Sequence, residues 1–166
     1  MERKKELLII AHCILNQNAV IKGWERAPGP FSSIVKDILD QNLGIIQLPC
    51  PEFRFAGEDR PPMTLQEYDT PDYRRHCRKL LEPVVDELEE YRNKGYLIKG
   101  IMGIEESPSC DGNRTPGIYM QELQGLLRDV GITVSVWDVP ADYLESEKPR
   151  GLEELQRFYH FKKTIE

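Results

Sequence analysis

Three cysteines in this chain follow apolar runs of the kind that form buried β-strands. Cys13, Cys50 and Cys110 each come within a few residues of the end of such a run. Parallel strands of an α/β sheet end at one edge, and that edge is where such folds place their ligands. We therefore expect the three thiols to meet there. Thiolates are soft ligands that suit zinc, copper(I) or an iron–sulfur cluster, and three of them would leave one iron of a cubane cluster free.

The spacing of these cysteines leaves a second interpretation open. No two of them have the close spacing of a CxxC metal motif. They could therefore be three unrelated loop cysteines. The fourth cysteine, Cys77, lies on the apolar stripe of a predicted helix and is expected to be a small core residue.

Polar residues beside the cysteines are candidates for catalysis and for cofactor contact. Glu52 lies two residues after Cys50, where a carboxyl group could give or take a proton at a metal-bound substrate, or could simply be solvated. Ser107 and Ser109 precede Cys110 and could contact the substrate and the cluster, or could only cap a turn. We predict Glu52 and Ser107 as catalytic residues and Ser109 as a cofactor-binding residue.

His12 adjoins Cys13 and could in principle supply a fourth ligand. On an extended segment, however, neighbouring side chains point to opposite faces. We therefore expect His12 in the core or behind the ligands, and a site that stays open.

Composition and charge limit the class of protein. With 166 residues, 40% apolar and 30% charged, the chain has the size and composition of one ordinary soluble domain. Its formal charge of −6 gives no broad attraction for nucleic acid or anionic membranes, so a small-molecule partner is expected. Residues 2–5 are charged and lead into an apolar run no longer than a strand, so we expect no secretion signal and a cytoplasmic protein.

The predicted elements alternate between strands and helices. This order favours a single α/β domain over residues 1–166, with three layers and a mainly parallel sheet. The long helix has a Thr70 cap, and Pro83 is expected to kink or split it. A basic patch on its polar side is interpreted as a solvated face rather than an RNA contact. The predicted strands are residues 6–11, 44–48, 96–104 and 132–136, and the predicted helices run from Ser32 or Ser33 to about residue 42, from 71 to 93, from 116 to 129 and from 152 to 161.

At the three cysteines and the residues beside them, the chain resembles the thiouracil desulfidase family, TudS. The resemblance rests on Cys13, Cys50-Pro51-Glu52, Arg60-Pro61-Pro62 and Ser107-Pro108-Ser109-Cys110, whose order and approximate spacing cover most of the chain. It implies a Rossmann-like domain in which a [4Fe-4S] cluster is held by Cys13, Cys50 and Cys110.

The same resemblance implies a reaction in sulfur metabolism. The thione sulfur of a thiolated pyrimidine such as 2-thiouracil would bind the open iron, water would add to the ring carbon, and the sulfur would remain on the cluster before leaving as sulfide. Glu52 would activate the water or shuttle its proton, and Ser107 would orient the substrate or donate a proton.

Two segments depart from that family's usual pattern. Family members commonly continue the first cysteine into a second cysteine and an Arg-Tyr-Asp-Gly run, whereas residues 14–18 here read Ile-Leu-Asn-Gln-Asn. The glycine usual after the last cysteine is Asp111. Both segments are expected to line the substrate pocket. The resemblance therefore supports the same cluster more strongly than it supports the same substrate.

Two other functions fit the same residues. A sulfur-transfer protein would use the open iron in the reverse direction, but would normally need an activating nucleotide site, and no glycine-rich phosphate loop is present. A structural or sensing module would hold zinc or a cluster in a closed site completed by His12.

Overall fold

A four-stranded sheet organises the chain. The computed structural model describes residues 1–147. The strands β1 (Glu6–Ile10), β2 (Gly44–Gln47), β3 (Leu97–Ile104) and β4 (Val136–Val139) lie in the order β2-β1-β3-β4. Every neighbouring pair is parallel, which confirms the predicted α/β class and parallel sheet.

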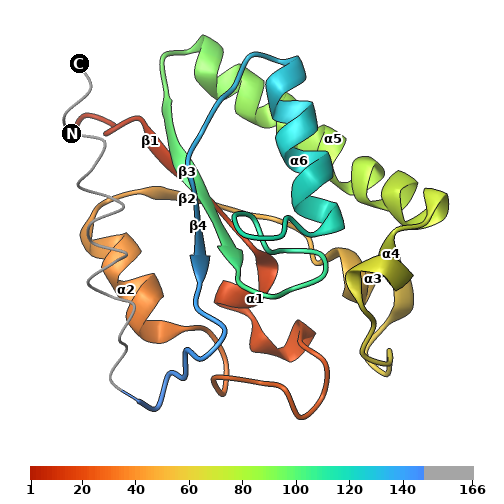
Figure 1. The fold of residues 1–166 in the computed structure, drawn as a ribbon. Helices are drawn as coiled ribbons and strands as arrows, with labels where there is room; N and C mark the ends of the chain where they lie inside the picture. Colours follow the sequence, from red (N-terminus) through yellow and green to blue (C-terminus); the bar gives the residue numbers. More distant parts are fainter. Residues whose placement is uncertain (148–166) are drawn as a thin grey trace.

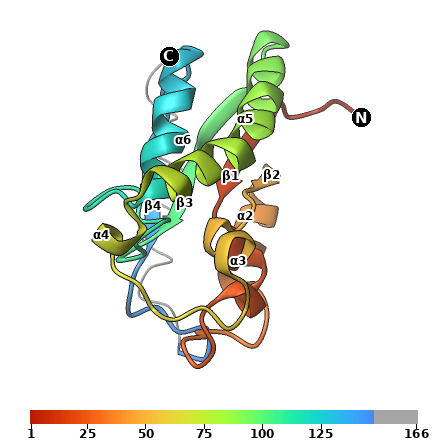
Figure 2. The ribbon, with the colours of Figure 1, turned by 90° about the vertical axis from the view of Figure 1, so that its right-hand side faces the viewer.

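Helices cover both faces of this sheet and make three layers (Figures 1 and 2). α2 lies on one face, and α5 and α6 lie side by side on the other. None of the described helices is long and apolar enough to cross a membrane. The helical segments are α1 (His12–Leu15), the 3-10 turn η1 (Gln17–Ala19), α2 (Ser32–Asp40), α3 (Pro51–Ala56), α4 (Leu65–Tyr68), α5 (Pro71–Asn93) and α6 (Ile118–Asp129).

The inner strands are buried on both faces because their apolar runs alternate between two cores. Leu8 and Ile10 pack on the α2 side with Met102, whereas Ile9 and Ile101 pack against α5 and α6. Near-continuous apolar strands of this kind are typical of parallel sheets covered on both faces. Because successive side chains of a strand point to opposite faces of the sheet, the same short segments contribute to both cores.

The long helix α5 begins as predicted, and of the two outcomes expected at Pro83 it shows a bend and not a split. Thr70 caps it by accepting a hydrogen bond from the amide of Tyr73 at 3.2 Å, and Pro71 occupies the first turn. The helix runs unbroken through Pro83, which is exposed, and Figure 2 shows it curving along its length. An exposed proline can be accommodated because water satisfies the carbonyl that its ring leaves without a partner.

Several short helices and the position of one strand differ from the predictions. Pro51, directly after Cys50, begins α3, which is not among the predicted helices; the first turn of a helix suits proline. Thr64 and Glu67 form a capping box that starts α4, which is also not among the predicted helices. β4 forms at Val136–Val139 rather than at 132–136, because pairing with β3 decides where the ladder lies. The helix predicted at 152–161 lies outside the described residues.

Gly103 of β3 is packed too closely for a side chain. A Cβ there would lie 2.5 Å from the carbonyl oxygen of Cys110 and closer still to a carboxylate oxygen of Asp138. We predict that Gly103→Ala lowers the free energy of unfolding by about 1–3 kcal/mol, because the loop carrying Cys110 must shift. Urea denaturation followed by circular dichroism measures this.

Gly125 of α6 is the matched control, because its Cβ would meet no atom closer than 3.9 Å. Gly125→Ala should raise the free energy of unfolding by about 0.5–1 kcal/mol. Equal stability of wild type and Gly103→Ala would contradict the close packing of β3 against the Cys110 loop.

Candidate functional site

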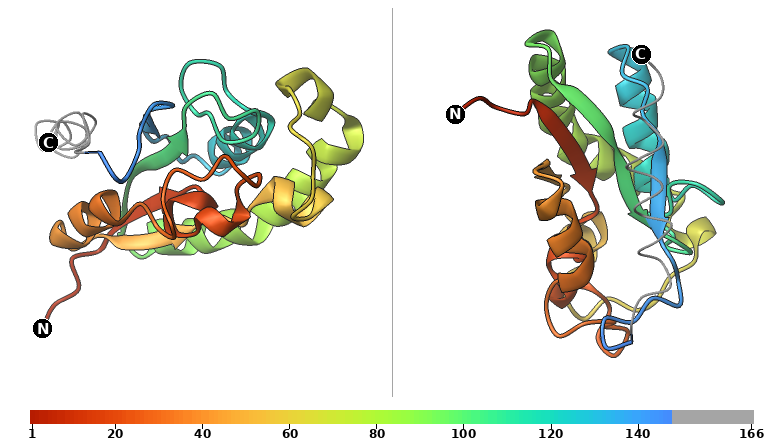
Figure 3. Two further views of the ribbon diagram at one scale, coloured as in Figure 1. Left: turned by 90° about the horizontal axis from the view of Figure 1, so that it is seen from below. Right: turned by 90° about the vertical axis from the view of Figure 1, so that its left-hand side faces the viewer.

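Hydrogen bonds beyond the strand ends hold the three cysteines at one edge of the sheet. Ala11 donates to the Met102 carbonyl and Leu48 to the Ile10 carbonyl, both at 2.9 Å, so the chain stays in register almost to Cys13 and Cys50. The loop after β3 folds back until the Cys110 carbonyl accepts a bond from the amide of Ile104 at 2.9 Å. Figure 3 shows this edge from below.

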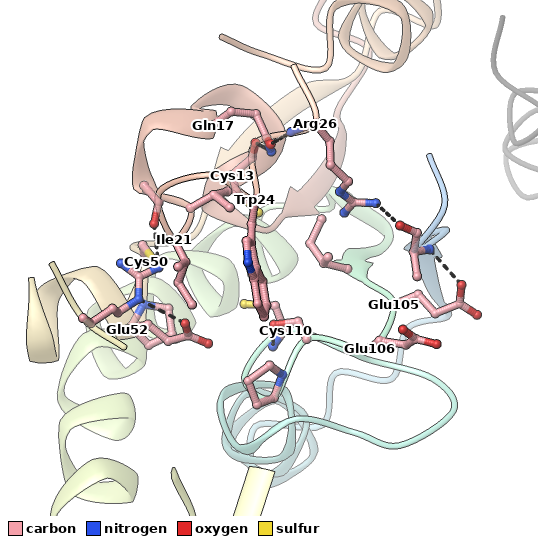
Figure 4. Close-up of a pocket in the computed structure, with 18 of the residues that line it drawn as sticks. Cys13, Gln17, Ile21, Trp24, Arg26, Cys50, Glu52, Glu105, Glu106 and Cys110 are labelled. Atoms are coloured by element: carbon pink, nitrogen blue, oxygen red, sulfur yellow. Dashed lines mark hydrogen bonds and ion pairs between the residues drawn. The ribbon is translucent and has the colours of Figure 1, made fainter. Parts of the chain in front are cut away.

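All three cysteines line one cavity of about 470 Å³, a size typical of small-molecule sites (Figure 4). Glu52 and Ser107 line it as well. The structure therefore brings together every predicted site residue except Ser109. The other walls come mainly from the segment after α1 and from the end of β3, with Gln17, Ala19, Val20, Ile21, Trp24, Arg26, Ile104, Glu105, Glu106 and Pro108 among the lining residues.

The three sulfur atoms lie close enough to influence one another's ionisation. Burial raises the pKa of Cys13 to about 12, and the charge of Cys50 adds to this. Burial also raises the pKa of Cys110 well above its usual value, and the charges of Cys13 and Cys50 act in the same direction. Without a cation among them, the thiols stay protonated near neutral pH, which does not suit an activated cysteine nucleophile.

The three thiols line the wall of a cavity. In residues 1–147, no group of three or more His, Cys, Asp or Glu side chains is arranged to hold a single metal ion. A zinc ion draws each sulfur to about 2.3 Å from one centre, whereas the cysteines of a cubane cluster bind different irons. Three thiols that line one cavity are a donor set of the kind that a cluster with one open iron requires.

Glu52 is held firmly at the edge of the cavity. Its side chain accepts a hydrogen bond from Ser109 Oγ at 2.7 Å and one from Arg60 Nε at 3.3 Å. Arg60 also donates to the carbonyl oxygens of Ala19 at 2.7 Å and Gly57 at 3.1 Å. Glu52 and Arg60 are only 9% and 6% exposed, so Glu52 is not the solvated carboxylate that the sequence left open.

Two tyrosines lie on the buried side of the Glu52, Ser109 and Arg60 contacts. Tyr73 lies with its hydroxyl 2.7 Å from Ser109 Oγ. Because the Ser109 hydroxyl donates its proton to Glu52, Tyr73 is the donor of the bond to Ser109. Within residues 1–147 the buried hydroxyl of Tyr68 has no hydrogen-bond partner, and burial, with the charge of Glu52, raises its pKa. A tyrosine on an apolar helical stripe indicates core, so sequence reasoning missed Tyr73.

The Ser-Pro-Ser-Cys turn gives its two serines different positions. Ser107 lines the cavity, and its Oγ accepts hydrogen bonds from the amides of Cys110 at 2.9 Å and Ser109 at 3.4 Å. Ser109 is fully buried and does not line the cavity. Its hydroxyl contacts Glu52 rather than the space between the cysteines. The Ser109 hydroxyl thus contacts the carboxylate, and its contact with a cluster stays a prediction.

Asp111 and His12 both serve the surrounding structure. The Asp111 carboxylate is buried and accepts hydrogen bonds from three backbone amides of its own loop. His12 starts the one-turn helix α1 instead of continuing an extended segment. Its Nδ1 lies 3.3 Å from the Leu48 carbonyl and its Nε2 lies 3.4 Å from Asn16 Nδ2. Neither Asp111 nor His12 lines the cavity.

Cys77 is fully buried in the core that α5 forms with α6 and the sheet, which confirms its predicted place.

The fold and this cavity together define a parallel α/β protein with a thiol-lined site at the carboxyl edge of its sheet. No family model matches the chain, and no solved structure matches it. The chain is similar to uncharacterized protein MJ0003 from Methanocaldococcus jannaschii, with 42% identity over 144 residues that cover 87% of this chain and 92% of that protein. The chain belongs to the same family as that protein.

Arg60 should be essential to the stability of the site. We predict that Arg60→Met lowers the free energy of unfolding by about 3–5 kcal/mol, because it leaves the buried Glu52 without its cation. Arg54→Met is the control, since Arg54 is an exposed arginine of the same segment, and it should change stability by less than about 0.5 kcal/mol. Equal losses in the two variants, measured in urea, would show that the buried pair is not special.

Proposed function

We propose that this protein is a desulfidase that holds a [4Fe-4S] cluster through Cys13, Cys50 and Cys110 and removes sulfur from a thiolated pyrimidine. The observation that supports the proposal is the shared cavity, in which three soft ligands from three strand ends face a firmly held carboxylate. The net change is a hydrolysis: C=S and water give C=O and hydrogen sulfide. No oxidant or reductant is needed.

When bound, a cluster with three protein thiolates would supply an open iron that attracts thione sulfur and acts as a Lewis acid. The chain's own residues would manage the water and its protons. Glu52 lines the cavity, and bonds from Ser109 and Arg60 fix the orientation of its carboxylate. A carboxylate held in this way can accept the proton of a water molecule that attacks the ring carbon.

Ser107 and the Tyr73–Ser109 pair support this role from two sides. The Ser107 oxygen already accepts two backbone amides, so its own proton is available to a group in the cavity. Tyr73 donates to Ser109, which donates to Glu52. These hydroxyls hold one carboxylate oxygen of Glu52 and Arg60 holds the other, so the carboxyl group keeps one orientation at the cavity.

The position of His12 favours an open site over a closed one. Both ring nitrogens already lie within hydrogen-bond distance of Leu48 and Asn16, and the ring does not line the cavity. Closing the site with His12 would require both contacts to break. A substrate-binding centre therefore suits this arrangement better than a structural zinc site.

Cofactor binding can be tested by spectroscopy. Protein purified without oxygen should show a broad visible absorption band with equal amounts of iron and acid-labile sulfide. Cys13→Ser, Cys50→Ser and Cys110→Ser should each lose most of both, because each removes one ligand. Cys77→Ala should retain them, since Cys77 lies in the core. A colourless wild-type protein that takes up only zinc, or no metal, after reconstitution would refute the proposal.

Catalysis by Glu52 is tested by measuring sulfide release from 2-thiouracil. Glu52→Gln keeps the shape of the side chain, so iron content should be unchanged, while kcat should fall by about 10²- to 10⁴-fold because the amide accepts no proton. Glu58→Gln is the control, since Glu58 is an exposed carboxylate of the same segment outside the cavity. Unchanged turnover in Glu52→Gln would remove Glu52 from the mechanism.

A further inference from the structure

Trp24 is a large aromatic side chain that the fold leaves open to solvent inside a cavity. It is 61% exposed, yet it lines the same pocket as the three cysteines (Figure 4). The exposed Phe53 and Phe55 do not line this pocket. A tryptophan contributes nothing to the core from such a position, so its contact surface is available to a ligand.

A defined turn presents this side chain. The amide of Trp24 donates to the Ile21 carbonyl at 2.9 Å, and Gly23 between them has φ +88°. This is the conformation of a β-turn that requires glycine at its third position. Ile21 and Trp24, the first and last residues of the turn, both line the cavity.

The segment that carries the turn is tied directly to the cysteine edge. Gln17 is buried, and its amide nitrogen donates to the Cys13 carbonyl at 2.8 Å while its oxygen accepts from the amide of Arg26 at 3.0 Å. The Arg26 guanidinium donates to the carbonyls of Pro140 and Ala141 at 2.6 and 3.1 Å. The two ends of the segment that carries Trp24 are therefore fixed relative to Cys13.

We propose that Trp24 is the residue on which the pyrimidine ring of the ligand stacks, and that it thereby sets which face of the ring lies against the cavity wall. This inference rests on the proposed function, since the thione must reach the cysteines. Val20, Ile21 and Trp24 make an apolar wall. A flat apolar wall suits the face of an aromatic ring, and stacking on tryptophan is tolerant of ring substituents.

Equilibrium binding of 2-thiouracil and of uracil tests the proposal, because uracil presents the same ring without the sulfur. Trp24→Leu should raise the Kd of both ligands by about 5- to 150-fold in calorimetric titrations. Trp24→Phe should keep most of the affinity, since it retains an aromatic face. Phe53→Leu, which changes an exposed aromatic outside the cavity, should leave both Kd values unchanged.

A fluorescence measurement adds direct evidence of contact. The chain has two tryptophans, so in a Trp137→Phe background the emission comes from Trp24 alone, and ligand stacking should quench it to saturation with the calorimetric Kd. Unchanged Kd values in Trp24→Leu, or a failure of wild type to bind either ligand, would overturn the inference. Weaker uracil binding by Trp24→Leu in a protein that holds no cluster would support the stacking and refute the desulfidase proposal alone.

Discussion

Parallel pairing of β1 with β2 and β3 is the constraint on which the site depends. Parallel strands run in the same direction, so the segments that leave their carboxyl ends start from one edge of the sheet. Here the ladder continues past the strand ends through the amides of Ala11 and Leu48. Cys13 and Cys50 therefore start from fixed points, although they are far apart in the sequence. The return of the Cys110 carbonyl to the end of β3 adds the third thiol without another strand.

The buried Glu52–Arg60 pair shows how a carboxyl side chain can be accommodated at the edge of an apolar interior. A buried charge without a partner is strongly unfavourable, and a paired one is tolerable only if its remaining hydrogen bonds are made. Arg60 meets that condition with two backbone carbonyls, and Glu52 meets it with Ser109. The same contacts that stabilise the pair also orient the carboxylate, so stability and positioning have one origin.

The segment between α1 and α2 connects the cysteine edge of the cavity to the wall that carries Trp24. Gln17 bridges the backbone of Cys13 and that of Arg26, and the turn at Gly23 lies between them and presents Trp24. This segment includes residues 16–18 of the stretch 14–18, where the sequence departs from the desulfidase pattern. A change there alters the wall that a ligand would meet while leaving the three thiols where the sheet puts them.

The sequence by itself determined the class of fold and the residues near the site. Its apolar runs specify strands buried on two faces, Thr70-Pro71 specifies the start of α5, and the positions of Cys13, Cys50 and Cys110 after strands indicate one edge, because these signals are local or follow from chain direction. Only the tertiary structure decided that Ser109 faces Glu52 rather than the cavity, that Arg60 and Tyr73 support the carboxylate, that Pro51 starts a helix, and that Trp24 belongs to the cavity wall. These depend on contacts between segments distant in the chain, and the direction in which a buried side chain points is set by packing rather than by its neighbours in sequence.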